Sequence, residues 1–550
     1  MKDSYDAVVI GSGFGGAITA YRLAQAGRSV AILEQGRRWQ KEEYPRTVGQ
    51  TSQAAFWQEM TRETTREQTK DRTNGFLEYR AFKNIDVIQG VGVGGGSLHY
   101  FNVNLRAPAR VLDRWPAPLT RARLDPYYAL AEENLESRPL APPALRVLPP
   151  RTQAFMAAAQ ASGGQPQLTP IAVYTGPERT NRGGVTQSAC VYCGNCMLGC
   201  HVHAKNSLDI TYIAAAERRY GVEMYPLHKV EGIRPSTEKG AAYQVDFRVL
   251  AGRGGATGER GSLYAQKVIV AAGALGSTEL LLRCRDQLRT LPRLSATLGT
   301  RFSGNGDMLF AGAWRTKEAI DPAQGPSITA VVDCSTEDHA IHVEDLGFPD
   351  PMFWMLEGVL PPGLGGLRQA LGLLGRYLAR SLGMGGRTSR VTDQLGAFLG
   401  GGRANHFLPY LGMGTDAADG ELRLRDGALD VVWSHRKSRS MFRQMEKAMR
   451  RISAQTGGEY VASFLWRWPS RKLLTAHPLG GAVIGGDEHT GVVNHAGEVW
   501  NYPGLYVTDG ASIPSALSVN PSLTIAAIAE RAAFWMLHGR ERVASDPDGA

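Results

Sequence analysis

The fold of this chain is decided by one stretch near its start, Asp6-Ala-Val-Val-Ile-Gly11-Ser-Gly13-Phe14-Gly15-Gly16-Ala17. Residues 8–10 are an apolar run typical of a buried strand, and Gly11 permits the tight turn that follows it. Gly13 allows a pyrophosphate to approach the backbone, while Gly16 lets the next helix pack closely on the strand. The free N–H groups at the start of that helix favour negative charge. We therefore expect a dinucleotide to contact Gly11, Gly13, Phe14, Gly15 and Gly16.

A second strand follows at residues 30–34, Val-Ala-Ile-Leu-Glu. Its last residue, Glu34, stands 21 residues beyond Gly13, where an acid can accept a hydrogen bond from a ribose hydroxyl. A carboxylate there disfavours a 2′-phosphate, so NADP is the least favoured dinucleotide. The motif does not separate NAD from FAD, and a purely structural glycine turn is the alternative.

Length and charge set broader bounds. A chain of 550 residues exceeds one hydrophobic core, so two closely joined domains are expected. The net charge of +9 comes from 61 basic and 52 acidic residues spread along the chain, which indicates a mixed solvated surface and no nucleic-acid partner. Residues 1–5 lead directly into the first strand, so we expect no leader segment and a cytoplasmic protein. The apolar run at 359–386 is broken by prolines, glycines and arginines, which argues against a membrane span.

A glycine-rich loop is the second informative stretch. It places five glycines within residues 90–96 and follows them with Ser97. Glycines at this density let a backbone pass close to something flat or phosphorylated, and the apolar Val91, Val93 and Leu98 among them argue against a mobile linker. We expect cofactor contacts from Gly92, Gly95, Gly96 and Ser97.

Four of the six cysteines lie within eleven residues, as Cys190-Val-Tyr-Cys193-Gly-Asn-Cys196-Met-Leu-Gly-Cys200. This spacing is that of the bacterial ferredoxin run, in which thiolates on a tight loop hold an iron–sulfur cluster. The run departs from that pattern because His201 replaces the usual proline and no second cysteine group exists. Zinc, disulfides and inert thiols therefore stay open as alternatives to a cluster held by Cys190, Cys193, Cys196 and Cys200.

The middle of the chain returns to strand and helix signals. Strand patterns cover residues 224–230, 243–250 and 267–270, and the last leads into a glycine turn that opens a helix at 271–282. Val230, Ala272 and Gly273 are therefore further candidate cofactor contacts. Residues 304–307, Gly-Asn-Gly-Asp, form another turn cluster.

Composition changes from about residue 308 to 470, which indicates a second domain. Within it, leucines recur at helical spacing from Leu364 to Leu382 beside three arginines. Core packing, a lid over an apolar substrate and a face resting on a membrane surface are the interpretations of this patch.

The C-terminal region returns to the cofactor. His477 stands against Pro478 and a glycine pair, where its side chain can be aimed rigidly into a cleft. A strand, the turn at Asp509-Gly510 and a helix beginning near Asn520-Pro521 then fit a last strand meeting a flavin ribityl chain, with a helix N-terminus directed at the isoalloxazine. NAD dehydrogenases need only the first motif, so this return favours FAD.

Together these motifs resemble the glucose–methanol–choline (GMC) family of FAD oxidoreductases, and most closely its cholesterol-oxidase-like branch. The resemblance covers the N-terminal glycines with Glu34, the 90–97 loop, residues 271–282, and His477 with Asn520-Pro521. It implies that His477 is the base or hydrogen-bond partner at the substrate hydroxyl and that Asn520 helps to hold substrate or reduced flavin. Asp509, Gly510 and Pro521 would contact the flavin, and Glu344 or Glu357 would be the glutamate that some sterol-oxidising members add. The sequence departs from sterol oxidases at residues 98–100, where His99 is a candidate for covalent attachment of the flavin.

The expected fold is therefore α/β, with a Rossmann-type FAD-binding domain from residues 1–120, 185–307 and 471–550. A substrate-binding domain of α+β type, built on an antiparallel sheet, would use 121–184 and 308–470. The expected activity is oxidation of a CH–OH group, in a sterol-like or other bulky apolar alcohol, by hydride transfer to flavin. The electron acceptor would be oxygen or an external carrier. A neutral histidine suits this chemistry because it can accept the hydroxyl proton near neutral pH.

Two other functions stay open. The cysteine run is similar to insertions in long-chain alcohol oxidases and sugar dehydrogenases of the same superfamily, in some of which a cluster carries electrons onward. A sugar or polyol dehydrogenase is therefore one alternative, and an isomerase or another non-redox flavoprotein is the other. Peripheral membrane contact through the leucine patch and the oligomeric state are also left open.

Overall fold

The computed structural model describes residues 1–54, 57, 75–140, 148–251, 255–353, 405–466, 472–543 and 546. The leucine patch at 364–382 and Glu357 lie outside the described residues. Among the helices that are described, none has both the length and the apolar character needed to cross a membrane.

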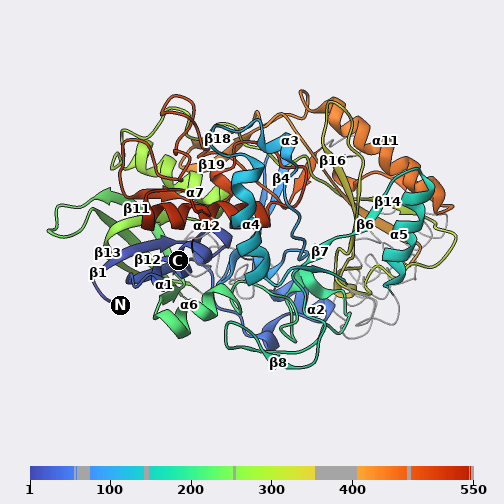
Figure 1. The fold of residues 1–550 in the computed structure, drawn as a ribbon, viewed down its shortest axis with the longest axis horizontal. Coiled ribbons are helices and arrows are strands. Elements are labelled where there is room, and N and C mark those ends of the chain that lie inside the picture. Colours follow the sequence, from blue (N-terminus) through green and yellow to red (C-terminus); the bar gives the residue numbers. More distant parts are fainter. Residues whose placement is uncertain are drawn as a thin grey trace, which may run out of the picture.

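A seven-stranded sheet carries the N-terminal motif and lies on the left of Figure 1. Its order is β10-β2-β1-β13-β12-β11. The seventh strand, β22, pairs with the C-terminal end of β13, beyond the part that pairs with β12. Strands β10, β2, β1, β13 and β22 run parallel to one another. Strand β12 is antiparallel to β13, and β11 is antiparallel to β12. The strands span Ser4–Ile10 (β1), Val30–Glu34 (β2), Glu223–Pro226 (β10), His228–Pro235 (β11), Tyr243–Ala251 (β12), Gly255–Val270 (β13) and Leu505–Val507 (β22).

Helices pack on this sheet around the largest hydrophobic core. Helix α1 (Phe14–Gln25) connects β1 to β2 and contacts both α6 (Tyr212–Tyr220) and α12 (Ser522–His538). Arg22 of α1 forms a buried ion pair of 2.6 Å with Glu530 of α12, so the first and last helices are joined inside the protein. Helix α4 (Arg121–Asn134) also packs on α12.

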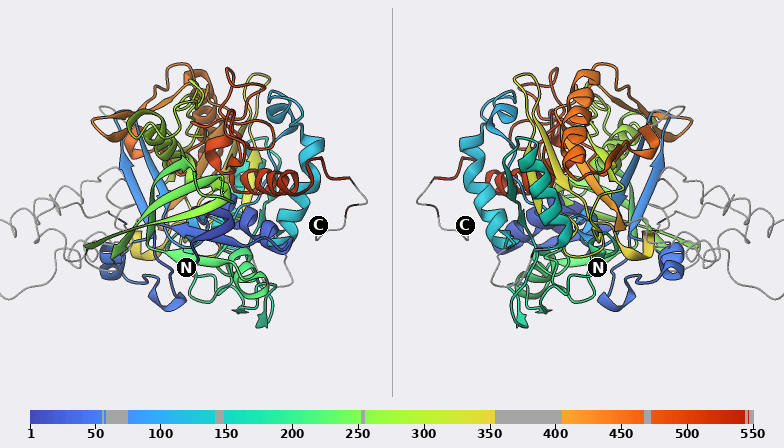
Figure 2. Two further views of the ribbon diagram at one scale, coloured as in Figure 1. Left: turned by 90° about the vertical axis from the view of Figure 1, so that its left-hand side faces the viewer. Right: turned by 90° about the vertical axis from the view of Figure 1, so that its right-hand side faces the viewer.

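A six-stranded antiparallel sheet forms the other half of the molecule, in the order β20-β14-β17-β16-β15-β6. Helices α5 (Pro150–Ala161) and α11 (Arg439–Gln455) cover one face, as the right-hand view of Figure 2 shows. Buried Met441, Met445 and Met449 recur every four residues on α11, and Gly412 and Gly414 of the sheet leave room for them. The strands are Pro166–Leu168 (β6), Met308–Trp314 (β14), Ala330–Asp333 (β15), Ile341–Asp345 (β16), Phe407–Gly414 (β17) and Glu459–Val461 (β20).

A small sheet, β21-β4-β3, lies next to the cofactor loop. Strand β21 (Leu473–Thr475) runs parallel to β4 (Ile85–Gly90), so the segment that leads to His477 lies beside the segment that leads to the glycine-rich loop. The remaining elements are α2 (Val48–Ala54), α3 (Ala109–Leu112), α7 (Gly273–Leu282), β3 (Leu77–Ala81), β5 (Arg138–Pro139), β7 (Pro170–Ile171), β8 (Arg179–Thr180), β9 (Thr186–Gln187), β18 (Glu421–Arg425) and β19 (Ala428–Val432), with short 3₁₀ turns η2 (Gly95–Leu98), η4 (Asn195–Leu198) and η9 (Gly510–Ser512).

The predicted fold class is confirmed, because a largely parallel sheet with helices is joined to an antiparallel sheet. The domain boundaries stay a prediction. The strands of the two large sheets fall in the segments expected for the FAD-binding and substrate-binding domains, respectively. Helix α4 follows the predicted boundary at residue 120, yet its Leu124, Tyr127 and Tyr128 belong to the core of the first sheet.

Candidate active site

Three glycines close the turn between β1 and α1 by backbone contact. Gly11 has φ +94°, and a Cβ there would collide with the carbonyl of Ala271. A Cβ on Gly15 would meet the carbonyl of Thr508, and one on Gly16 would meet that of Gly11. Gly11 and Gly15 thus bring the ends of β13 and β22 onto the turn, while Gly16 allows the close approach of α1 that the sequence predicted.

The open side of this turn faces a cavity of about 1090 Å³. A Cβ on Gly13 or Gly96 would meet no protein atom within 4 Å, and both glycines line the cavity beside the N-terminus of α1. The volume exceeds the range of about 300–1,000 Å³ that is common for small-molecule sites. The residues present therefore fit a dinucleotide with its phosphates at the N-terminus of α1, and the volume leaves space for a substrate.

Most predicted site residues line this one cavity. They are Gly11, Gly13, Phe14, Gly15, Glu34, Gly95, Gly96, His99, Val230, Ala272, Gly273, His477, Asp509, Gly510, Asn520 and Pro521. Gly16, Gly92 and Ser97 are not among the lining residues. Gly16 packs α1 on its strand, and Ser97 holds the glycine-rich loop by donating to the Gly94 carbonyl at 2.6 Å and accepting from the Leu208 N–H at 2.9 Å. The cofactor roles of these residues stay predictions.

Glu34 lines the cavity, but protein donors already occupy its carboxylate. One oxygen accepts from the N–H and hydroxyl of Ser12 at 3.1 and 2.7 Å, and the other from the N–H groups of Gly36 and Gly92 at 2.8 and 3.3 Å. Burial raises the pKa of Glu34 despite these hydrogen bonds. Glu34 therefore ties the glycine-rich loop to β2, and its contact with a ribose stays a prediction.

Asp509, which lines the cavity close to Gly15, joins two elements. It accepts from the N–H of Gly273, at the start of α7, at 2.7 Å, from the Ser277 hydroxyl at 2.5 Å and from the Ala511 N–H at 2.9 Å. Complete burial raises its pKa to about 6. The Asp-Gly turn thus fastens the C-terminal return of the chain to the first turn of α7.

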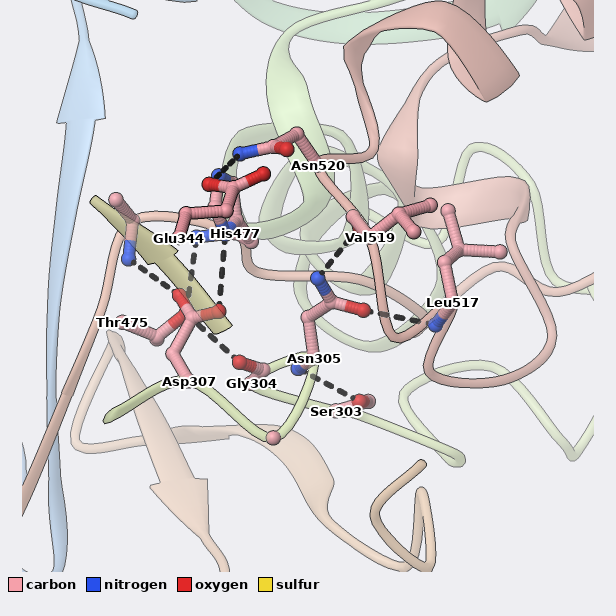
Figure 3. A network of polar contacts seen from close by, with 12 residues as sticks. Ser303, Gly304, Asn305, Asp307, Glu344, Thr475, His477, Leu517, Val519 and Asn520 are labelled. Carbon is pink, nitrogen blue, oxygen red and sulfur yellow. Dashed lines mark hydrogen bonds and ion pairs between the residues drawn. The ribbon is translucent and has the colours of Figure 1, made fainter. Parts of the chain in front are cut away.

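His477 is held by a carboxylate that the sequence analysis did not assign to the site. Its Nδ1 lies 2.9 Å from Oδ1 of Asp307, whose side chain is 1% exposed (Figure 3). The histidine lines the cavity with a side chain that is 15% exposed, and none of the hydrogen bonds identified among the described residues uses its Nε2. That nitrogen is therefore available to a ligand.

Asn520 and Glu344 lie beside His477 (Figure 3). The Asn520 amide donates to Glu344 at 3.4 Å, while Oδ1 of Asn520 and the other carboxyl oxygen of Glu344 have no hydrogen-bond partner among the described residues. Burial raises the pKa of Glu344 well above its ordinary value. Asn520 lines the cavity, whereas Glu344 is not among the residues that line it.

His99 is a buried neutral histidine on the wall of the same cavity. Burial, together with the nearby charges of Lys205 and His477, lowers its pKa to about 3. Its Nε2 has no hydrogen-bond partner among the described residues. His99 therefore presents a neutral imidazole ring to a ligand in the cavity.

Apolar side chains form another wall of the cavity. Phe310 stands at a bulge in β14, has φ +61° and packs edge-to-face on Phe348 with ring centroids 5.4 Å apart. A bulky residue in this conformation is strained, and bulges commonly redirect a side chain at a site. The wall consists of Phe101, Leu309, Phe310, Phe348, Met352 and Leu474.

The four clustered cysteines do not form a metal site in this structure. All are free, and no group of three or more His, Cys, Asp or Glu side chains in the described ranges is arranged to hold a metal ion. The side chains therefore do not fit a cluster as they stand, and the iron–sulfur prediction rests on spacing alone. Burial raises the pKa of Cys190 and Cys200, which favours neutral thiols.

The cysteine loop nevertheless contacts the cofactor loop. Lys205 is completely buried, and its ammonium donates to the carbonyls of Leu98, Tyr100 and Cys196 at 2.8–3.0 Å. Burial lowers its pKa to about 8. Met197, between two of the cysteines, lines the cavity.

Sequence reasoning missed Lys205 and Asp307 as parts of the site. Asp307 belongs to the turn cluster at 304–307, which was recognised as a turn but given no function. A polar residue directly before the buried strand β14 was the available signal. Lys205 carries no comparable signal, because a single lysine is usually exposed.

This arrangement defines an oxidoreductase of the flavin-dependent alcohol-oxidising class: a dinucleotide turn, a large cavity, and a histidine and an asparagine at its end. Profiles of the GMC oxidoreductase family match residues 5–284 and 418–529, and the chain belongs to that family. It is therefore an FAD-dependent enzyme that acts on alcohol-type substrates.

Similar proteins agree with this assignment. Cholesterol oxidase of Mycobacterium tuberculosis is 29% identical over 97% of this chain and 92% of its own length. Cholesterol oxidase of Acinetobacter baumannii is 29% identical over 97% of this chain and 94% of its own. The crystal structure of pyridoxine 4-oxidase from Mesorbium loti superposes with a TM-score of 0.63 at 15% identity, covering 98% of this chain and all of that one, which shows the shared fold.

Proposed function

We propose that this enzyme oxidises a bulky, apolar secondary alcohol of sterol type to the carbonyl compound, with His477 as the base. The observation that carries the proposal is the ring of His477, held at Nδ1 by Asp307, with Nε2 unoccupied at the cavity. FAD, when bound, would supply the two-electron acceptor that takes the carbinol hydrogen as hydride.

The residues of this chain would bind and orient the alcohol. The hydroxyl would donate to Nε2 of His477, and the proton would pass to that nitrogen as the C–H bond breaks. Asn520, whose Oδ1 has no partner in the part of the chain that the structure describes, would contact the same oxygen or the flavin edge. The isoalloxazine would lie near His99 and Gly96, the pyrophosphate near Gly13.

The apolar wall supports the choice of substrate. Phe310 and Phe348 belong to a group of apolar residues in the cavity lining, and burial of a steroid-like skeleton against such a surface is favourable. The second alternative, a sugar or polyol dehydrogenase, would need several hydrogen-bonding groups at this wall. The relatives named cholesterol oxidase favour the same substrate class and oxygen as the electron acceptor.

Of the two glutamates that the resemblance suggests, Glu344 is the one whose contact with Asn520 supports a role at the site. Because Glu344 accepts from the Asn520 amide and does not itself line the cavity, we assign it to orienting Asn520. The iron–sulfur cluster in the four-cysteine loop stays a prediction from spacing.

Anaerobic flavin reduction tests the proposal. A 3β-hydroxysterol in detergent is expected to bleach the flavin at least tenfold faster than glucose does. His477→Ala should keep its FAD and lose about 10²–10⁴ in the rate of reduction, the usual contribution of a general base. His489→Ala is the control, because that histidine side chain is 84% exposed and is not among the residues that line the cavity. Wild-type reduction by His477→Ala would remove the histidine from the mechanism, and faster reduction by glucose would reverse the substrate assignment.

We expect the FAD to be bound without a covalent link. Acid precipitation should release yellow flavin into the supernatant. A yellow pellet that becomes colourless in His99→Ala would instead show attachment through His99.

A further inference from the structure

One turn, residues 303–307, contacts both the segment that carries His477 and the segment that leads to Asn520 (Figure 3). It connects the segment after α7 to β14 and is buried throughout, with Ser303, Asn305 and Asp307 at most 2% exposed. Asp416 anchors it from below by accepting from the Ser303 hydroxyl and the Gly306 N–H at 2.8–3.0 Å. Nothing in the proposed chemistry requires this turn to be so polar.

Asp307 holds three successive residues of the histidine segment. Its Oδ2 accepts from the N–H of Ala476 at 3.1 Å and lies 2.8 Å from the hydroxyl of Thr475. That hydroxyl in turn accepts from the N–H of His477 at 2.9 Å. Both the backbone and the ring of His477 are therefore located by one carboxylate.

The same contacts decide which ring nitrogen carries the proton. Carboxylate oxygens accept hydrogen bonds, and Oδ1 of Asp307 lies 2.9 Å from Nδ1 of His477. Nδ1 is then the protonated nitrogen of the neutral ring, and Nε2 carries the lone pair. Only this tautomer presents an acceptor to the cavity.

Asn305 holds the other half of the site. Its amide donates to the carbonyl of Val519 at 2.9 Å, and its oxygen accepts from the N–H of Leu517 at 2.7 Å. Between those residues Ser518 has φ +61°, so the chain bends sharply immediately before Asn520. Asn305 therefore fastens the bend that delivers Asn520 to the cavity.

We infer that the 303–307 turn is the positioning element of the active site, and that Asp307 is a positioning residue that fixes the reactive tautomer of His477. This inference rests on the proposed function. In the reaction the hydroxyl proton passes to Nε2, the carbinol hydrogen leaves with two electrons for the flavin, and the C=O bond forms. Asp307 gains and loses no proton, and Asn305 touches no substrate.

Asp307→Asn is the main test, because its amide group has nearly the same size but can donate to Nδ1 and stabilise the wrong tautomer. We expect it to keep FAD, to bind the alcohol with a KM within about threefold of wild type, and to lose at least about 10² in the limiting rate of flavin reduction. Asp307→Glu, which keeps the acceptor, should recover part of the rate. Equal losses in both variants, together with lost FAD, would overturn the inference in favour of a structural role.

A double-mutant cycle identifies the route of the effect. In a His477→Ala background, Asp307→Asn should change the rate of flavin reduction by less than about threefold, because the residue through which it acts is gone. Additive losses would overturn the inference. Asp416→Asn is the matched comparison, since it removes a carboxylate that accepts hydrogen bonds from the same turn and makes no hydrogen bond to His477 among the described residues. It should lower the Tm more than the rate.

The cycle also separates the two claims. Full activity of His477→Ala would defeat the proposed function. An inactive His477→Ala together with a fully active Asp307→Asn would defeat only the positioning role.

Discussion

The β1–α1 turn and the cysteine loop both carry spacing patterns of recognised type, yet they differ in what the structure makes of them. At the turn, Gly11, Gly15 and Gly16 permit contacts between backbones that no other residue allows. In the loop, the thiols of Cys190 to Cys200 are free and do not surround a common point. A glycine pattern constrains the backbone, and so predicts geometry. A cysteine pattern gives only the ligands that a geometry would need.

The largest effect expected from this difference is at Gly13. Its neighbours are packed, but a Cβ on Gly13 would meet no protein atom and would project into the cavity. We expect Gly13→Ala to fold with wild-type Tm as apoprotein and to bind FAD at least about tenfold more weakly, a loss of about 1.4 kcal/mol. Flavin titration by fluorescence quenching, with differential scanning calorimetry of the apoprotein, measures both.

Gly27→Ala is the control for Gly13→Ala, because Gly27 also has no protein atom near its missing Cβ but lies away from the cavity lining and has φ +78°. That variant should lose stability, by about 1 kcal/mol, and keep its FAD affinity. Unchanged FAD affinity in Gly13→Ala would show that the dinucleotide does not follow this turn.

Phe310 offers an intermediate case, since a backbone feature aims a side chain. Phe310→Gly should relieve the strain of φ +61° while removing the ring from the cavity wall. We expect kcat/KM for a sterol to fall at least about tenfold, as loss of apolar pocket contacts does, with little change for a short-chain alcohol. Phe310→Ala should lose the same specificity and be about 1 kcal/mol less stable than Phe310→Gly. Equal losses for both alcohols would contradict the role of this wall in specificity.

The smallest effect on activity is expected in the cysteine loop. Because burial raises the pKa of Cys190 and Cys200, their thiols should react slowly with iodoacetamide at pH 7, and faster by about tenfold per pH unit towards pH 9, as the thiolate fraction grows. The exposed Cys193 should react first. Mass spectrometry of the modified peptides follows this order.

The opposite result would support the iron–sulfur prediction. Joint protection of all four cysteines, with about four irons and matching sulfide per chain in anaerobically prepared protein, would mean that the loop closes around a cluster. The cysteine loop would then have a defined geometry like that of the β1–α1 turn, but would reach it only when the cluster binds.

Much of the cofactor half was predictable from sequence because its signals are local. The strand, turn and helix at residues 4–25 and the Asp509-Gly510 turn follow from glycines and apolar runs, and 16 of the predicted residues line one cavity. The supports of His477 were not predictable in this way. Asp307 lies 170 positions away from His477 in the sequence and Asn305 lies 212 from Leu517, so only the folded chain brings them together. The strained conformation of Phe310 likewise has no sequence signal, since phenylalanine rarely adopts it.

The strand order of the large sheet bears on how the living cell makes this enzyme. Strand β1 pairs with β13, and β13 pairs with β22, so the first and last thirds of the polypeptide meet in one layer. Synthesis proceeds from the N-terminus, and the nascent chain exposes β13 long before β22 leaves the ribosome to cover its edge. Because Asp509 and Asn520 line the cavity and are synthesised near the end of the chain, we expect flavin to bind late in biogenesis. Until β22 arrives, residues 268–270 of β13 form a short open edge, and such edges tend to pair with other chains.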